Sequence, residues 1–192
     1  AMETVPSIVK LDPSAVELAD RTMIDLANQN PDFQPTIEKF LKGNPAAILL
    51  VEFSGDENNL LLKKLSQLHE LLGDLGFSID IIDEIDPAFQ ADVWEVRKSG
   101  LNILMAMKGD GKPVSFIEDC AVPLEQLAEY TDRLNQEFDQ HGVQGTWYAH
   151  ASVATLHVRP VLNMKDPEHA VKMRQIAEAA CATVKEMKGA FS

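Results

Sequence analysis

The residue types best suited to chemistry in this 192-residue sequence are two histidines, His150 and His157, in an apolar, strand-prone segment. Neutral imidazole is a common ligand of zinc, iron and manganese, and a common acid or base. On one straight strand their odd spacing places the two side chains on opposite faces. They can share a ligand only if the chain bends between them, which the small residues 151–155 permit. The alternative is two separately hydrogen-bonded structural histidines near a strand end.

Two arginines could accompany the histidines. Arg159 follows His157 by two residues, so both side chains should share a strand face. An arginine beside a histidine could clamp a substrate carboxylate next to an acid or base. Arg97 lies with Trp94 on one face of an expected helix and could reach the same pocket. For each arginine, the alternative is an exposed surface position.

Other polar residues suggest no further site. Glu118 and Asp119 are adequately explained as two solvated carboxylates at a strand end. Cys120 and Cys181 lie far apart and match no Cys-x-x-Cys pattern, so we expect two reduced thiols in a cytoplasmic protein.

Composition excludes several classes of protein. With 45% hydrophobic and 24% charged residues, the chain is long enough for one compact domain with a sizeable core. A net charge of −13 without a basic cluster argues against nucleic-acid and anionic-membrane binding. No apolar run approaches the roughly 20 residues that span a bilayer.

Hydrophobic periodicity and turn residues predict an alternation of helices and strands. Helices are expected at 11–27, 35–42, 60–75, 87–98, 123–138 and 166–188, and strands at 46–53, 77–84, 113–122, 146–153 and 156–162. This order favours an α+β sandwich of ferredoxin-like type, a mostly antiparallel sheet with helices packed on one face. The alternative is a fully parallel doubly wound sheet. No Gly-x-Gly-x-x-Gly follows the first strand, so a Rossmann nucleotide site lacks its mechanism.

Four stretches, in order along the chain, match one family pattern. They are similar to its opening helix (15–20), its Trp-x-x-Arg helix (94–98), its strand-to-helix step ending in Val-Pro (119–123) and its Gly-His-x-Gly-Asp-Gly-Asn-x-His block (149–157). On these residues the chain resembles the C-terminal (cap) domain of FAD-linked oxidases and D-2-hydroxyacid dehydrogenases. That group contains D-lactate dehydrogenase, the glycolate oxidase flavin subunit and D-2-hydroxyglutarate dehydrogenase.

Two departures from the pattern matter. The usual Gly-Asp-Gly-Asn is Ser152-Val-Ala-Thr155 here, and Arg159 stands where many members have Asn. The His-Val-Arg-Pro-Val-Leu-Asn form resembles the branch of long proteins in which the flavin part is fused to an iron–sulfur region. Gly189-Ala-Phe-Ser192 resembles the start of the family's Gly-x-x-Ser-Gly-Glu-His-Gly motif, so a third metal ligand is expected beyond Ser192.

The resemblance implies that residues 1–192 are the C-terminal domain of a larger chain, with the FAD-binding domain upstream. The full enzyme would oxidise a D-2-hydroxyacid by hydride transfer to FAD. His150 and His157 would contact the hydroxyl or a divalent metal (Zn, Fe or Mn), and Arg159 and Arg97 would bind the substrate carboxylate. Iron–sulfur clusters would lie downstream.

The implied partners are a small 2-hydroxyacid, the FAD-binding domain of the same chain, an electron acceptor and a second copy in a homo-oligomer. The implied location is the cytoplasm, with peripheral attachment to the inner membrane as an option. Because the chain holds no complete catalytic set, the alternative function is a non-catalytic ferredoxin-like regulatory or assembly module that binds a small molecule or partner.

Overall fold

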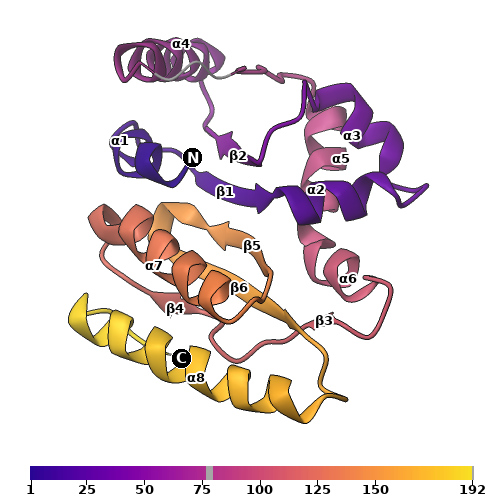
Figure 1. The fold of residues 1–192 in the computed structure, drawn as a ribbon. Coiled ribbons are helices and arrows are strands. Elements are labelled where there is room, and N and C mark those ends of the chain that lie inside the picture. The colour runs from indigo at the N-terminus through magenta and orange to yellow at the C-terminus, as the bar shows by residue number, and fades with distance from the viewer. Residues whose placement is uncertain (77–79, 192) are drawn as a thin grey trace.

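The structure, a computed structural model, describes residues 1–76 and 80–191. At its centre is a sheet with strands in the order β2-β1-β5-β6-β3, with β4 also paired to β6 (Figure 1). The strands are β1 (Ala15–Asp20), β2 (Ala47–Glu52), β3 (Lys112–Pro113), β4 (Cys120–Ala121), β5 (Gly145–His150) and β6 (Thr155–Leu162). All pairings among these strands are antiparallel. The predicted α+β class is therefore confirmed, and the fully parallel alternative is wrong.

Helices account for most of the remaining described residues. The α-helices are α1 (Val5–Val9), α2 (Arg21–Asn28), α3 (Gln34–Phe40), α4 (Asn58–Asp74), α5 (Pro87–Lys98), α6 (Gly100–Met105), α7 (Leu127–Gln140) and α8 (Pro167–Glu186). Short 3₁₀ turns are η1 (Met2–Thr4), η2 (Leu124–Gln126) and η3 (Ala151–Val153). None of the described helices combines the length and apolar character that crossing a bilayer requires.

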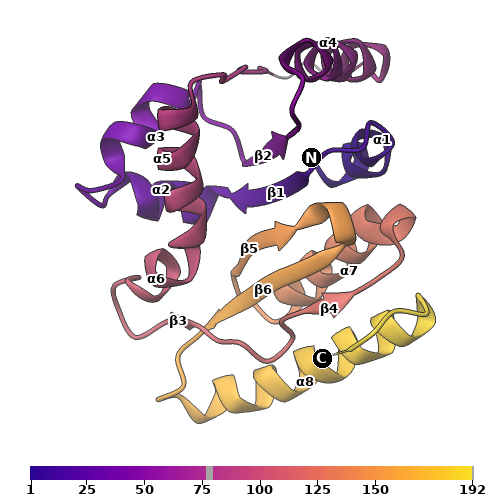
Figure 2. The same ribbon diagram turned by 180° about the vertical axis from the view of Figure 1, so that it is seen from behind.

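The main core lies on one face of the sheet. Alternate strand residues such as Val16, Leu18, Leu156 and Val158 point into it and are buried. Helices α1, α4, α7 and α8 supply the opposite side of this core. Seen from behind, β5 and β6 lie in front of α7 (Figure 2). Their other face is therefore free of that helix and can carry polar residues.

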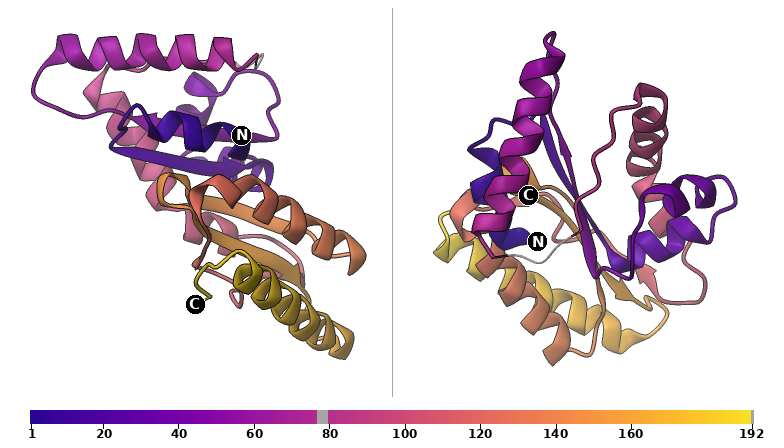
Figure 3. Two further views of the ribbon diagram at one scale, coloured as in Figure 1. Left: turned by 90° about the vertical axis from the view of Figure 1, so that its left-hand side faces the viewer. Right: turned by 90° about the horizontal axis from the view of Figure 1, so that it is seen from above.

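Helix α5 approaches this second face. It lies on the opposite side of β1 and β2 from α4 (Figure 3). Trp94 donates its indole N–H to Glu52 of β2 over 2.8 Å, and Arg97 reaches Glu17 of β1. Because these two α5 residues are three apart, they project from one side of the helix. The sheet and α5 thus enclose part of the polar face.

The prediction of a helix from residue 11 is wrong for its first half, and so is the assignment of 15–20 to the family's opening helix. Residues 15–20 form β1, which pairs with both β2 and β5. Val16 and Leu18 have strand periodicity and fill the core, while pairing on both edges satisfies the backbone. Only residues 21–28 of this range are helical, and Asp20 caps that helix by accepting the backbone N–H of Met23.

Two predicted strands also need correction. Residues 77–79 of the strand 77–84 lie outside the described residues, and residues 80–84 form no strand. There Asp83 contacts His69 of α4 and Glu84 accepts the backbone N–H of Asp86, so side chains replace ladder bonds. The strand 113–122 is reduced to β3 and β4, both paired to β6. Between them the chain bends, and Asp119 adopts a left-handed φ of 61°.

Candidate functional site

The β5–β6 hairpin brings the two histidines together. His150 ends β5, and His157 is two residues beyond its cross-strand partner Thr155. Between the strands the chain turns through η3, and Ala154 takes a left-handed φ of 52°. The imidazole centroids lie 5.0 Å apart, with the rings nearly perpendicular. The bend that the spacing required is therefore present, although this turn contains no glycine.

His150 is anchored by a carboxylate on the neighbouring strand. Its Nδ1 lies 2.8 Å from Oε1 of Glu17, the residue directly opposite it on β1. The other oxygen of Glu17 accepts hydrogen bonds from Nε of Arg97 at 2.9 Å and Nη2 at 2.5 Å. The side chain of Glu17 is 9% exposed. A buried carboxylate thus connects the histidine and the arginine.

His157 faces a second acidic group. Its Nδ1 lies 2.6 Å from Oδ1 of Asp119 and 3.4 Å from Oε1 of Glu118. Nδ1 of His157 has no hydrogen-bond partner in this rotamer, so these are close contacts that become ion pairs only when the imidazole is protonated. Nη2 of Arg159 donates to both oxygens of Glu118, at 2.6 and 2.7 Å. Around His157, as around His150, a carboxylate therefore links an arginine to a histidine.

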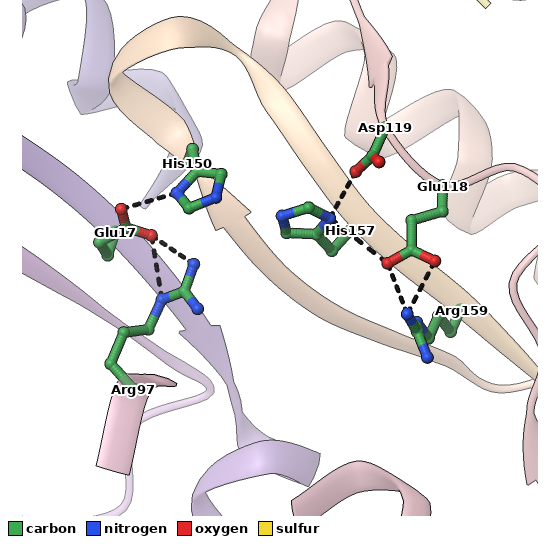
Figure 4. Close-up of polar contacts among 7 residues, drawn as sticks. All are labelled: Glu17, Arg97, Glu118, Asp119, His150, His157 and Arg159. Atoms are coloured by element: carbon green, nitrogen blue, oxygen red, sulfur yellow. Dashed lines mark hydrogen bonds and ion pairs between the residues drawn. The ribbon is translucent and has the colours of Figure 1, made fainter. Parts of the chain in front are cut away.

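The imidazole nitrogens turned away from the carboxylates face one another. Figure 4 shows the second ring nitrogen of His150 on the side toward His157, and that of His157 on the side toward His150. Arg97 and Arg159 lie at opposite ends of this pair. Imidazole nitrogens directed into a shared space, with the other ring nitrogens on carboxylates, are typical of metal-binding histidines.

Burial affects the ionisation of the site. It lowers the pKa of His157 below its usual range, although Asp119 acts in the opposite direction. A neutral imidazole keeps a lone pair for a proton or a metal ion. The ring of Tyr148 contacts two residues of the site: its centroid lies 4.7 Å from that of His157 and 5.2 Å from Cζ of Arg97. Burial raises the pKa of the Tyr148 hydroxyl.

Each residue singled out in the sequence therefore lies in one cluster: His150, His157, Arg159 and Arg97. Glu17 and Tyr148 were not expected from the sequence. The expectation that Glu118 is solvated is wrong, because its side chain is 20% exposed and pairs with Arg159, whereas Asp119 is 52% exposed as expected but also contacts His157. The ligand atoms of Glu118, Asp119 and His157 lie within 4.8 Å of one another, a grouping able to hold a cation. Tyr148 could have been predicted from the alternation of side chains along a strand, because it precedes His150 by two residues and therefore shares its face.

Comparison with known proteins gives consistent relatives. D-2-hydroxyglutarate dehydrogenase of Pantoea ananatis is 29% identical over 95% of this chain, and the enzymes of that name from Escherichia coli and Pseudomonas putida are 28% and 30% identical over 98%. The chain spans only 19% of the length of each of these relatives.

The fold is also found in a solved structure. The 4-ethylphenol oxidase of Gulosibacter chungangensis, in complex with isoeugenol, superposes with a TM-score of 0.54 over 97% of this chain and 42% of its own. At 9% identity this likeness concerns the fold alone. The family described as FAD linked oxidases, C-terminal domain, matches residues 1–192. The chain therefore belongs to the C-terminal domain family of FAD-linked oxidases.

Proposed function

We propose that this chain provides the substrate side of the active site in an FAD-dependent dehydrogenase that oxidises D-2-hydroxyacids. D-2-hydroxyglutarate is the first substrate to test, because the relatives carry that name. The observation that carries the proposal is the histidine pair, whose second ring nitrogens are directed toward one another at the polar face of the sheet. Such a pair suits contact with a hydroxyl group or with the metal ion that polarises it.

The charges around the histidines favour a divalent cation. Carboxylates of Glu17, Glu118 and Asp119 outnumber the guanidinium groups of Arg97 and Arg159, so the cluster is negative while both imidazoles are neutral. An anionic substrate would be repelled by that excess unless a cation offset it. Zn, Fe and Mn are the metals we propose. A bound metal would supply a Lewis acid for the substrate hydroxyl, and its third protein ligand is expected beyond Ser192.

Arg97 and Arg159 would bind substrate carboxylates. Glu17 occupies Nε and Nη2 of Arg97, and a guanidinium has five N–H donors in all. Donors on Nη1 therefore lie outside that pair. The second arginine sits at the other end of the histidine pair, a placement that suits a dicarboxylate such as 2-hydroxyglutarate.

In the complete protein FAD would be the hydride acceptor and the residues of this chain would orient the substrate. The substrate C2–H bond would break as a hydride leaves for the flavin. Where an imidazole of the pair contacts the hydroxyl directly, its free ring nitrogen would take the hydroxyl proton. Where the same nitrogen holds a metal ion, its lone pair is used and the imidazole would only position the ion. The 2-hydroxyacid becomes a 2-oxoacid. Iron–sulfur clusters and the electron acceptor that reoxidises the flavin remain predictions from the resemblance.

The test uses the full-length protein with His150→Ala, His157→Ala and the control His69→Ala, an exposed histidine on α4. Turnover of D-2-hydroxyglutarate, D-lactate and glycolate is measured, together with bound metal by mass spectrometry. Both site variants should lose metal and at least about 100-fold in turnover, the range of acid–base catalysis, while His69→Ala should keep both. Survival of turnover in the two site variants would overturn the proposal. A full-length protein that binds neither flavin nor metal would favour the non-catalytic module.

A further inference from the structure

Glu17, like Tyr148, belongs to the site although neither the sequence pattern nor the resemblance brought it forward. It lies in the middle of β1 with 7% of its surface exposed. A carboxylate is rarely buried without partners, because loss of hydration costs several kcal/mol. Glu17 divides its oxygens between two residues: Oε1 contacts His150, and Oε2 contacts Arg97 (Figure 4).

The contact with His150 selects one form of the imidazole. An ionised carboxylate only accepts hydrogen bonds, so Nδ1 of a neutral His150, 2.8 Å away, must carry the proton. Its lone pair is then on Nε2, the nitrogen that faces His157. Outer carboxylates that orient a ligand histidine in this way typically change metal affinity about 10–100-fold when removed.

The contact with Arg97 fixes the guanidinium. Nε and Nη2 both donate to Oε2, and Cζ lies 5.2 Å from the centre of the Tyr148 ring. Held by the carboxylate along one edge and by the aromatic ring across its plane, the guanidinium has a defined direction. The Nη1 donors of Arg97 therefore have a fixed orientation relative to the imidazole of His150, because both groups contact the carboxylate of Glu17.

We infer that Glu17 is a positioning residue that couples the tautomer of His150 to the orientation of Arg97. The inference rests on the proposed function, because a fixed Nε2 lone pair on His150 would serve metal binding and a fixed Arg97 would serve substrate binding. The coupling itself is a property of this chain and can be measured without turnover.

Glu52 provides a matched control. It lies on the neighbouring strand β2, on the same sheet face, and accepts a 2.8 Å hydrogen bond from Trp94 of α5. Glu52→Gln perturbs one carboxylate contact between the sheet and α5 without touching a histidine. An effect seen in Glu17→Gln and not in Glu52→Gln is therefore due to the histidine contact and not to loosening of α5.

The first measurement is nitrogen-15 NMR of the imidazoles in the metal-free 192-residue chain. Wild type should show His150 with a protonated Nδ1 and an unprotonated Nε2. In Glu17→Gln a side-chain amide can present N–H toward Nδ1, and the proton should move to Nε2. Glu52→Gln should keep the wild-type pattern. An unchanged tautomer in a folded Glu17→Gln chain overturns the inference.

The second measurement is Zn²⁺ affinity of the full-length protein by competition with a chelator. Glu17→Gln should bind about 10–100-fold more weakly, as expected for loss of an outer carboxylate, and Glu52→Gln should match wild type. If wild type binds no metal and oxidises no hydroxyacid, the proposed function fails while the NMR result still decides the role of Glu17. If Glu17→Gln does not fold, Glu17→Asp keeps the charge beside Arg97 but withdraws the acceptor from His150. A wild-type tautomer in that variant also overturns the inference.

Discussion

Asp20 is a buried acid whose ionisation should set part of the pH dependence of stability. It ends β1 and caps α2, and its two oxygens accept the backbone N–H groups of Met23 at 2.8 Å and Trp147 at 2.9 Å. Only 9% of its surface is exposed. Burial raises the pKa of Asp20 from 3.8 to about 6, because desolvation outweighs the hydrogen bonds.

The magnitude and sign follow from proton linkage. The pKa difference of about 2 units corresponds to about 3 kcal/mol, at roughly 1.4 kcal/mol per unit. Between pH 3.8 and about 6 the folded state of Asp20 binds more protons than the unfolded state. The contribution of Asp20 is therefore fully present below pH 3.8 and is lost as the pH rises through about 6.

The assay is urea unfolding of wild type, Asp20→Asn and the control Asp92→Asn, an exposed position on α5, at intervals from pH 4 to pH 8. The asparagine variant cannot titrate there and loses one acceptor, so wild type should be clearly more stable near pH 4. That advantage should shrink by about 2 kcal/mol between pH 4 and pH 7, because at pH 4 the unfolded carboxyl is already partly ionised, while Asp92→Asn should stay within about 0.5 kcal/mol of wild type. A constant difference between wild type and Asp20→Asn across this range would refute the reasoning.

Further substitutions test the packing around the site. Ala154→Gly, at the left-handed position of the turn, should change the free energy of unfolding in urea by less than about 0.5 kcal/mol, because relief of strain offsets the lost methyl group. The control is Ala149→Gly in β5, which is equally buried and should lower the free energy of unfolding by about 1–2 kcal/mol. Gly189→Ala should cost about 1–3 kcal/mol, since a Cβ there meets the backbone carbonyl of β4 that bridges to the C-terminal segment, and thermal unfolding would reveal it. Arg159→Met should cost about 3 kcal/mol by leaving Glu118 without its guanidinium. Adding Glu118→Gln should then recover part of that loss in a double-mutant cycle.

The long helices were predictable because local signals agree with one another. Residues 58–74, 87–98 and 167–186 are helical close to the expected ranges. Asp86 and Asp166 cap α5 and α8, each followed by proline at the first helical position. In α5 and α8 capping and the N-terminal proline favour the same structure as the hydrophobic periodicity, and in α4 the periodicity is sufficient without a side-chain cap.

The strand β1 was missed because its composition favours helix. Ala15, Glu17 and Leu18 are good helix formers, and Val16, Ala19 and Met23 also fit helical spacing. What decides the structure is pairing on both edges, with β2 and with β5, and the second of these is more than 120 residues away in sequence. Local propensity is a weak preference that tertiary pairing overrides.

The site was predictable in its histidines and arginines but not in its carboxylates. Arg97 and Glu17 are 80 residues apart, and Arg159 and Glu118 are 41 apart. A single sequence contains no signal for which acid meets which base across such distances, and most acids are on the surface. The interpretation of Glu118 as solvated failed for that reason, since the bend before β4 turns it toward β6.

The odd spacing of His150 and His157 argued against a shared site only while one straight strand was assumed. In the hairpin, His150 pairs with Thr155, five residues on, and direct partners of an antiparallel pair share a face. Moving by two residues along either strand keeps that face and changes the separation by two, so in this register two residues on opposite strands that share a face have an odd separation. The spacing of seven is therefore compatible with a shared face in this hairpin. The register is fixed by Leu156 and Val158, which fill the core, since a slip of one residue would bury His157 in their place.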